Sequence, residues 1–437
     1  MNLPEKIFKA GVIGAGGAGF PSHVKANAKA EIFLVNGAEC EPLVHKDVEL
    51  MKNFPGEIVS GLNLMIRQVC AKKAYFGIKE KNTAAIESIG KKINNDNTEI
   101  SLLGDFYPSG DEYELVYSAT KRLIPPHGIP LDVGCVVNNV ETLYNISRAE
   151  KDIPLTDKFV SVNGLVNEPK SFWAPVGTSF RDLINAAGGT KIKEYSIFVS
   201  GLLMGRLTFD VDEPVTKTIA GLIILPKDHY LVKRMNRPVE SMNRIGKSAC
   251  DQCSYCTEFC PRYLLGYDVQ PHKVMRSLAF SKTGSDMWNQ YADLCCSCGL
   301  CSLYACPEDL YPREACNQSK TVMRKQNRKY EQIKPVKVHP IKEGRRVPLK
   351  MLMKRLNVQE YDFKTPFDEI KISPESVKVL LKQHTGEAAN PLKNIGEKTN
   401  KGEMIAKPGE GKLGAVIHSP IDGTVTEVTK EFIRIRK

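Results

Sequence analysis

The sequence predicts a multidomain protein, with an α/β domain followed by β-rich modules and a helical metal-binding region. Three observations support this fold class. The 437 residues exceed the length at which single cores stop growing. Strand and helix patterns alternate through the first 150 residues. Eight of the 13 cysteines form two regularly spaced groups between Cys250 and Cys306.

The N-terminal region predicts a mostly parallel sheet. An apolar strand at 34–37 leads into a loop with two carboxylates, Glu39 and Glu41. A helix is expected from Pro55, with apolar residues on one stripe, followed by a strand at 75–78, a helix at 83–92 and a strand at 99–103. Because strands alternate with helices, both faces of the sheet should be covered.

A glycine-rich stretch at 11–25 precedes the first strand. Gly14, Gly16 and Gly19 satisfy the G-x-G-x-x-G pattern, and Glu39 follows where a ribose-binding acid would stand. Glycines let backbone N–H groups approach a phosphate, but several unrelated phosphate loops use the same device. The following Phe20-Pro21 is unusual for a Rossmann helix. A phosphate-binding loop is predicted, and its class stays open.

Three later loops combine polar groups with turn formers, at 107–112, 125–128 and 137–142. At the ends of strands in an α/β sheet, such loops favour a ligand site. On composition alone, capped turns explain them equally well. The isolated Cys40, Cys70 and Cys135 are interpreted as buried free thiols.

Two modules flank the cysteine groups. Short strands, a small helix and a glycine turn between Phe159 and Gly189 predict a β-grasp module that serves for packing. Short strands and glycine turns from 402 to 435 are typical of a barrel-sandwich module of the biotinyl and lipoyl type. Its turn at 421–423 has no lysine to modify, so a structural or docking role is expected.

The cysteine groups carry the most specific signal in the chain. Each has two residues between its first three cysteines, then a longer gap and a Cys-Pro pair. Three closely spaced thiolates can bind three irons of one cubane, and the fourth iron often takes a cysteine from the other group. The alternatives are a structural zinc site and, less favoured, disulfides. The predicted ligands are Cys250, Cys253, Cys256, Cys260, Cys295, Cys298, Cys301 and Cys306.

Two further cysteines lie near the second group. Cys296 is interpreted as a spare beside Cys295, because only Cys295 repeats the spacing of the first group. Cys316 is interpreted as a core thiol. Helices at 274–280 and 285–294 are expected between the two groups.

Composition limits location and partners. No apolar run approaches the roughly 18 residues that cross a bilayer, and the N-terminus lacks a signal-peptide core. Clustered thiols in an unexported chain indicate a reducing, cytoplasmic compartment. The net charge is +11, and residues 320–350 hold eleven Lys and Arg against two acids. With Tyr330 as its only aromatic residue, this stretch is interpreted as a solvated helix and basic linker rather than a nucleic-acid surface.

The motifs resemble a known superfamily. Residues 14–25, 36–42, 110–112 and 138–142 are similar to the flavin-site motifs of the NADH-oxidising subunit of respiratory complex I. They are still more similar to the C subunit of the Rnf complex and to the cobalamin reductases of propanediol utilisation. The latter resemblance extends over the whole chain, including 218–233 and both cysteine groups.

The resemblance implies a division of labour among site residues. It places the FMN phosphate at Gly14, Gly16, Gly17 and Lys25, and the flavin ring and ribityl chain near Asn36, Glu39, Gly110, Asn138, Asn139 and Thr142. It places nicotinamide near Phe20, Glu41 and Glu112, the last two as catalytic residues. Ala38, Asp111 and Ser22 depart from the residues usual in the complex I subunit, where an aspartate, a glutamate and a threonine stand.

The implied domains are a complex I flavin-subunit-like α/β domain (1–150), a soluble ligand-binding β-grasp (SLBB) domain (151–237) and a helical ferredoxin-type domain with two [4Fe–4S] clusters (238–330). A basic linker (331–380) and the barrel-sandwich module (381–437) follow.

The expected function is an NADH-dependent oxidoreductase that passes electrons from NADH to FMN, to two clusters and to an acceptor, with a corrinoid favoured. The acceptor is either a corrinoid enzyme or another electron-acceptor protein. One alternative is an Rnf-like subunit that feeds an amino-acid or methylenetetrahydrofolate reductase, and another is a cluster scaffold without flavin. No nucleic-acid partner and no membrane span are expected. Peripheral membrane association and a location in a bacterial microcompartment are compatible with this view.

Overall fold

The N-terminal domain is built on a four-stranded parallel sheet in the order β3-β2-β1-β5. The computed structural model describes residues 1–282 and 288–437. In this domain the strands are β1 (Ile32–Gly37), β2 (Lys73–Lys79), β3 (Thr98–Leu103), β4 (Phe106–Tyr107) and β5 (Cys135–Asn139). The helices are α1 (Leu3–Lys9), α2 (Ser22–Ala26), α3 (Lys46–Asn53), α4 (Pro55–Val69), α5 (Thr83–Gly90), α6 (Glu112–Thr120), η1 (Pro130–Val133) and α7 (Val140–Glu150).

Strand β1 shows why both faces of this sheet are covered. Phe33 and Val35 enter the core shared with α4 and α7, whereas Leu34 enters the core shared with α6. A strand buried on both faces reads as a continuous apolar run, as residues 32–35 do. The carboxyl ends of β1 and β5 lie side by side, with Asn36 paired to Asn139 in the strand register. This edge is where ligands bind in open α/β sheets.

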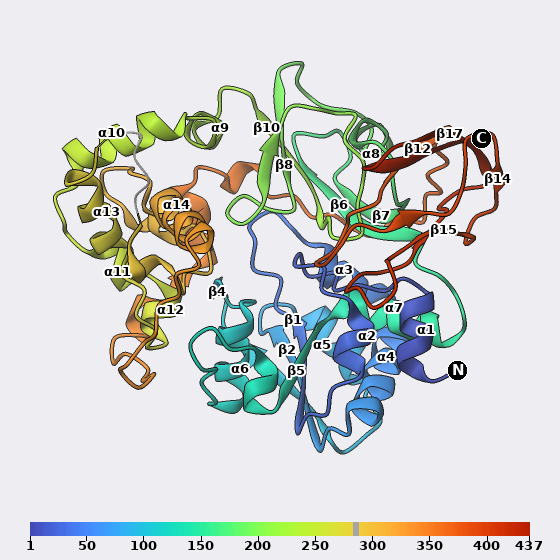
Figure 1. The fold of residues 1–437 in the computed structure, drawn as a ribbon, viewed down its shortest axis with the longest axis horizontal. Coiled ribbons are helices and arrows are strands. Elements are labelled where there is room, and N and C mark those ends of the chain that lie inside the picture. Colours follow the sequence, from blue (N-terminus) through green and yellow to red (C-terminus); the bar gives the residue numbers. More distant parts are fainter. Residues whose placement is uncertain (283–287) are drawn as a thin grey trace.

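The second domain is a five-stranded sheet in the order β7-β6-β10-β8-β9, as expected for a β-grasp. Its central strands β6 and β10 run parallel, and α8 covers one face. Its elements are β6 (Asp157–Gly164), β7 (Lys170–Pro175), α8 (Phe180–Ala186), β8 (Tyr195–Val199), β9 (Arg206–Thr208), β10 (Gly221–Pro226) and α9 (Tyr230–Met235). Figure 1 shows this domain above the N-terminal sheet.

The third domain is helical and carries both cysteine groups, at the left of Figure 1. Its elements are α10 (Val239–Ala249), α11 (Tyr255–Glu258), α12 (Pro261–Leu264), α13 (Pro271–Ala279), η2 (Gln290–Ala292), η3 (Cys301–Ala305) and α14 (Pro312–Lys325). The predicted helix at 274–280 is the larger part of α13. The helix predicted at 285–294 begins outside the described residues. Between 288 and 294 the structure has the short turn η2, which the Asn289 side chain caps at its start.

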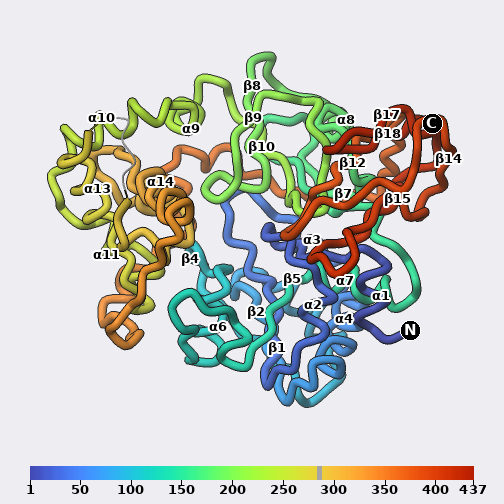
Figure 2. Tube along the Cα trace, in the orientation of Figure 1, coloured from blue at the N-terminus to red at the C-terminus, as the bar shows by residue number. Residues whose placement is uncertain are grey.

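The segment after α14 is not the solvated linker that its charge suggested. It contains η4 (Glu343–Arg345), β11 (Val347–Pro348), α15 (Leu349–Arg355) and η5 (Gln359–Tyr361). Strand β11 pairs with β4, and Leu352 of α15 is fully buried. Lys342 and Arg346 both pair with the buried Glu114 of α6, at 2.7 and 3.4 Å. The basic side chains therefore bind neighbouring domains, and Figure 2 shows the segment, in orange, crossing toward the C-terminal module.

The C-terminal module consists of two small antiparallel sheets around a shared apolar core. Its strands are β12 (Ser376–Leu380), β13 (Asn390–Pro391), β14 (Lys398–Thr399), β15 (Met404–Lys407), β16 (Ile417–His418), β17 (Gly423–Val428) and β18 (Phe432–Arg436). The first of these strands, β12, pairs with β18 and so extends the module into residues assigned above to the linker. No helix in the described part of the chain combines the length and apolar character needed to cross a membrane.

Lys217 joins the module to the first two domains. Its buried Nζ donates hydrogen bonds to the carbonyls of Gly11, at 2.7 Å, and Val416, at 2.8 Å. No ion pair between Lys217 and a carboxylate forms among the described residues, and the charge of Lys217 acts on His384 and His418. Burial lowers the pKa of Lys217 from its usual 10.5 to about 7.

This arrangement predicts a pH-dependent stability. Between pH 7 and 10.5 the unfolded chain binds a proton at Lys217 that the folded chain has released, so stability should rise with pH. We expect the advantage of the wild type over Lys217→Met in apparent thermal midpoint to grow between pH 7 and pH 9. The control Lys401→Met, at the surface of the same module, should show a constant difference. A constant difference for Lys217→Met as well would contradict the prediction.

Candidate functional site

The glycine loop forms an open cradle at the carboxyl edge of the sheet. A bridge between Ile13 and Pro21 closes its base, and the Ala15 amide donates to Thr142 Oγ1 at 2.9 Å. Gly16, Gly17 and Ala18 are exposed. Gly17 has φ +106°, and a Cβ there would meet nothing within 4 Å. The loop thus presents free backbone to solvent, as a phosphate-binding loop requires.

The helix that follows this loop distinguishes the loop from a Rossmann turn. Helix α2 has only five residues and begins after Pro21, whose side chain cannot accept a hydrogen bond from the first amides of the helix. It is too short to place a strong helix dipole against a pyrophosphate. The loop backbone and neighbouring side chains must therefore provide most of the contacts to an anion.

Asn138 is the buried polar group that most clearly lacks a protein partner. It is 3% exposed, and neither its Oδ1 nor its Nδ2 forms a hydrogen bond among the described residues. The buried hydroxyl of Ser109 is likewise unpartnered. Because leaving such groups unpaired is costly, they indicate a ligand with both donors and acceptors. The edge of a flavin ring has that composition, so the residues present fit FMN.

Other predicted flavin residues are brought together but bind protein groups. Asn36 donates to the Gly110 carbonyl at 2.9 Å and so holds the 110–112 loop against β1. Asn139 caps α7 and donates to Asp47 at 2.7 Å. Glu39 accepts hydrogen bonds from the Asp47 amide at 3.0 and 3.1 Å. These residues shape the site by fixing its loops.

Glu39 is also a titratable group near neutrality. Burial, followed by the nearby charge of Asp47, raises its pKa to about 7. A carboxyl group with this pKa can hold or release a proton at physiological pH. Glu39 follows the end of β1, and β1 pairs with β5, the strand that contains the unpartnered Asn138.

Lys25 and Glu112 meet on the solvent side of the site. Lys25 Nζ donates to the Val137 carbonyl at 2.8 Å and lies 3.5 Å from Glu112 Oε1. Both side chains are partly exposed, at 29% and 46%. They can therefore rearrange around a ligand at a small energetic cost. Phe20 lies at the base of the loop, where its carbonyl accepts from the Gly14 amide at 2.8 Å.

Glu41 occupies a position that the sequence did not predict. Its carboxylate accepts hydrogen bonds from the amides of Leu202 and Leu203, both at 3.0 Å, and of Met204, at 2.8 Å. Tyr107 Oη lies 3.3 Å away and donates to the Cys298 carbonyl at 2.8 Å. A Cβ at Gly201 would stand 2.5 Å from this carboxylate, which explains the glycine there. Glu41 thus joins three domains.

The C-terminal module contacts the glycine loop, and no sequence pattern predicted this contact. Thr385 donates from its amide to the Gly19 carbonyl at 3.0 Å and from Oγ1 to the Ala18 carbonyl at 2.8 Å. A Cβ at Gly19 would meet Thr218 Cγ2 at 2.9 Å. Residues 383–385 and Thr218 therefore support the loop from outside. No local motif marks them, because their role depends on tertiary contact.

The cysteines form two sets of four, and each set takes its fourth cysteine from the other sequence group. Cys250, Cys253 and Cys256 surround one small cavity with Cys306, whereas Cys295, Cys298 and Cys301 surround another with Cys260. Among the described residues no three such side chains converge on the position of a single ion. Each thiolate of a cubane binds a different iron, so close convergence is not needed. Burial raises the pKa of Cys256 to about 12, so ligation must displace its proton.

The spare cysteines have different surroundings. Cys296 lines the same cavity as Cys295. The choice of Cys295 over Cys296 as the ligand therefore stays a prediction. Cys316 is fully buried beside Cys295. Cys40 lies beneath Gly110, where a Cβ would approach its Sγ to 3.3 Å. Cys70 is exposed at the end of α4 and contacts Lys29 Nζ at 3.1 Å, so the interpretation of it as a buried thiol was wrong.

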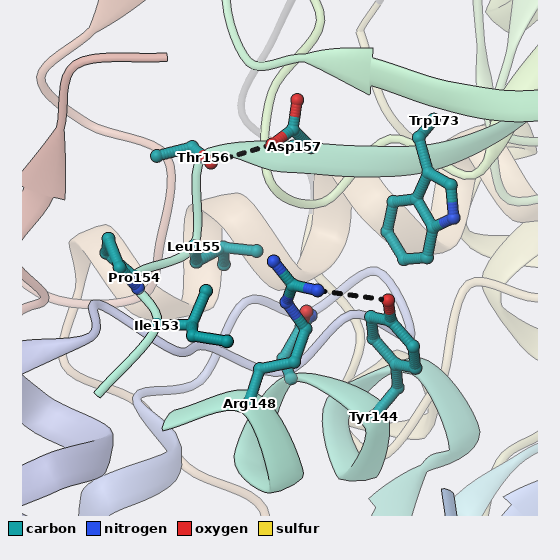
Figure 3. A pocket seen from close by; sticks show the side chains of 9 residues that line it. Tyr144, Arg148, Ile153, Pro154, Leu155, Thr156, Asp157 and Trp173 are labelled. Carbon is teal, nitrogen blue, oxygen red and sulfur yellow. Dashed lines mark hydrogen bonds between the residues drawn. The ribbon is translucent and has the colours of Figure 1, made fainter. Parts of the chain in front are cut away.

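A cavity of about 160 Å³ is lined by none of the predicted site residues. It separates the end of α7 from β6 and β7, and Figure 3 shows Arg148 bonded to the Tyr144 hydroxyl beside Trp173. Trp173 stacks on Tyr144 with ring centroids 4.8 Å apart. The cavity contains no cysteine and no residue of the glycine loop. It is a gap at a domain seam and is remote from the redox chemistry.

Comparison with protein families agrees with this geometry. Residues 7–148 match the Nuo51 FMN-binding domain, and residues 249–311 match a 4Fe–4S dicluster domain. Residues 159–206 match the SLBB domain, and residues 358–436 match the RnfC barrel sandwich hybrid domain. The predicted fold class and the FMN and [4Fe–4S] cofactors are thereby confirmed. The chain is a flavo-iron–sulfur oxidoreductase.

Curated relatives identify the family. The chain is 36% identical to cobalamin reductase PduS of Salmonella typhimurium, with 99% of this chain and 96% of the relative covered. It is 35% identical to the enzyme of that name from Citrobacter freundii, with 100% and 96% covered. The C subunit of the proton-translocating ferredoxin:NAD(+) oxidoreductase complex of Clostridium ljungdahlii is 34% identical over 59% of this chain and 55% of that subunit. The chain belongs to the PduS cobalamin reductase family.

The unpartnered Asn138 gives a sharp test of the flavin site. Asn138→Leu removes two unsatisfied polar atoms at similar volume, so flavin-free protein should unfold at the same temperature or higher. FMN affinity should fall at least about tenfold, since hydrogen bonds to the bound ligand are lost. Fluorescence titration with FMN and thermal unfolding of the flavin-free protein measure both.

A buried asparagine with satisfied bonds is the control. Asn163 donates to the carbonyls of Leu43 and Phe363, at 3.0 and 3.1 Å. Asn163→Leu should lower the unfolding temperature and leave FMN affinity unchanged. Wild-type FMN affinity in Asn138→Leu would place the flavin elsewhere.

Proposed function

We propose that this protein oxidises NADH at its N-terminal domain and delivers the electrons singly to a corrinoid through its two cluster sites. FMN supplies the conversion, because it takes two electrons from a hydride donor and releases them to one-electron acceptors. Each NADH then reduces two one-electron acceptors and yields NAD⁺ and a proton. The observation that carries the proposal is the hydrogen bond from Tyr107 of the N-terminal domain to the Cys298 carbonyl, at 2.8 Å, which brings one cysteine set against that domain.

The residues of the glycine loop hold the phosphate in this proposal. Gly14, Gly16 and Gly17 provide backbone N–H groups, and Lys25 provides a positive charge that can turn from Val137 toward the ligand. Asn138 contacts the flavin ring, whereas Asn36, Gly110, Asn139 and Thr142 orient the surrounding loops. Glu39 exchanges a proton with the site, and its pKa of about 7 suits that task.

Glu112 and Phe20 remain on the nicotinamide side of the site. The partly exposed Glu112 faces solvent beside Lys25, where a second nucleotide could enter. Glu41 takes a different role from the catalytic one expected from sequence. With three amides of the 202–204 loop bound to its carboxylate, Glu41 positions the domains.

The contacts of the two cysteine sets support an order for the two clusters. The set with Cys260, Cys295, Cys298 and Cys301 lies against the flavin domain through the Tyr107–Cys298 bond. The other set includes Cys253, which is exposed, and it lies near α11 and α13 at the far edge of the helical domain in Figure 1. We therefore name the first set the proximal set and the second the distal set. Electrons enter at the proximal set and leave at the distal set.

The corrinoid acceptor is supported by the name of the full-length relatives and the high shared coverage. The second candidate is a subunit that feeds another reductase through a protein interface, supported by the similarity to the ferredoxin:NAD(+) oxidoreductase subunit. Location in the cytoplasm or in a microcompartment stays a prediction. Anaerobic NADH-dependent reduction of cob(II)alamin, followed by absorbance, tests the first candidate directly.

Cluster order leads to a prediction for single ligand substitutions. Cys253→Ser should remove the distal cluster, leave NADH reduction of FMN at the wild-type rate and slow corrinoid reduction by at least about tenfold. The proximal cluster should still be reduced by NADH in electron paramagnetic resonance spectra. Cys298→Ser should instead block reduction of the distal cluster by NADH, while dithionite still reduces it.

Two outcomes would contradict the order. One is a Cys298→Ser variant whose distal cluster is still reduced rapidly by NADH. The other is a wild-type protein whose FMN is not reduced by NADH at all, which would make the chain a relay fed by another donor.

A further inference from the structure

Arg262 lies between the flavin domain and the proximal cysteine set. It follows the ligand Cys260 by two residues, at the start of α12, and is 9% exposed. One terminal nitrogen, Nη2, donates to Asp111 Oδ2 at 2.9 Å. The guanidinium carbon lies 3.4 Å from the centroid of the Tyr113 ring. The side chain is therefore fixed by contacts on the flavin-domain side.

Apart from an interaction of the guanidinium with the Cys296 side chain, the remaining nitrogens of Arg262 lack partners among the described residues. Nε and Nη1 are buried and form no hydrogen bond among the described residues. The guanidinium interacts electrostatically with Cys295 and Cys296, both of which line the proximal cavity. Buried guanidinium N–H groups without acceptors are costly. Sulfur atoms of a bound cluster would provide acceptors at this position.

Other cations at this cavity are already used. Arg313 binds Glu314 and the Leu203 carbonyl, at 2.9 and 2.6 Å. Lys320 donates to the Cys295 carbonyl at 2.5 Å. Among the described cations that border the proximal set, Arg262 thus combines unpartnered nitrogens with a carboxylate partner in the flavin domain.

A positive charge here acts on cluster reduction. A cubane with four thiolates is negatively charged, and its charge becomes more negative by one unit on reduction. Net charge and hydrogen bonds to sulfur are the main protein controls of its potential. In a buried site the attraction is weakly screened, so a cation raises the potential and a nearby carboxylate lowers it.

We propose that Arg262 raises the reduction potential of the proximal cluster and that Asp111 limits this increase, so that the pair sets the first cluster's ability to accept an electron from the flavin site. The inference rests on the proposed flavin and cluster positions and concerns a pair that no motif assigned. Asp111 also caps α6 through the amides of Tyr113 and Glu114, at 3.1 and 3.3 Å. The pair therefore connects the 110–112 loop of the flavin domain to the proximal set.

The test substitutes each member of the ion pair in turn. The two substitutions should shift the reduction potential of the proximal cluster in opposite directions. Arg262→Met should make the proximal cluster about tenfold harder to reduce at equilibrium, a shift of about 59 mV to lower potential. Arg262→Lys keeps the positive charge, so its proximal cluster should have most of the wild-type potential. Asp111→Asn should move the potential upward, and asparagine preserves the helix cap. Redox titration of cluster-loaded protein, followed by electron paramagnetic resonance, measures each cluster separately.

Arg346→Met is the matched control for domain docking. Arg346 also pairs with an acid of α6, Glu114, but it packs on Phe106 and does not line the proximal cavity. Its substitution should shift the proximal potential far less than Arg262→Met. If Arg262→Met does not retain its cluster, Asp111→Asn still decides, because Arg262 stays in place in that variant.

Shifts of the same sign in Arg262→Met and Asp111→Asn, or no shift in either, would overturn the proposal in favour of a purely structural ion pair. Failure of the proposed electron path is a separate result. It would leave the two opposite shifts intact, while NADH reduced the distal cluster before the proximal one.

Discussion

The assembly depends on a single carboxylate at the junction of three domains. Glu41 lies in the loop after β1 of the flavin domain and accepts three amide hydrogen bonds from the β-grasp loop at 202–204. The neighbouring Tyr107 hydroxyl continues the contact to the Cys298 carbonyl. Burial raises the pKa of Glu41, and the hydrogen bonds from these amides and from Tyr107 oppose that rise by stabilising the charged form. Electron transfer needs a fixed distance between centres, and this cluster of bonds supplies it.

Several ion pairs in this protein join different domains. The basic segment after α14 places Lys342 and Arg346 on Glu114, Arg345 on Glu258 and Arg355 on Asp309. Charges within the interior also form a network, in which Lys46 and Lys158 both bind the fully buried Glu141. Such pairs are weak evidence for stability but strong evidence for a defined arrangement. A net charge of +11 therefore need not signal a polyanionic partner.

The C-terminal module and the β-grasp domain both act on the flavin domain. Thr385 binds the carbonyls of Ala18 and Gly19, and Lys217 joins Gly11 to Val416. A glycine loop has little rigidity of its own, because glycine is conformationally permissive. Support from two other domains restricts it. The predicted phosphate-binding loop is thus stabilised by residues more than 200 positions away in sequence.

Local pattern by itself determined the two cysteine groups, the parallel sheet and the glycine loop, because spacing and periodicity encode them over short distances. Residues 32–35 read as a buried strand, and two Cys-Pro groups read as cluster ligands. Tertiary structure alone decided which cysteine completes which set, that Glu41 binds the β-grasp loop, and that Cys70 is exposed. Each of these depends on how separate domains dock. Docking is set by shape and by the pairing of buried polar groups across long sequence separations, for which a single sequence has no periodic signal.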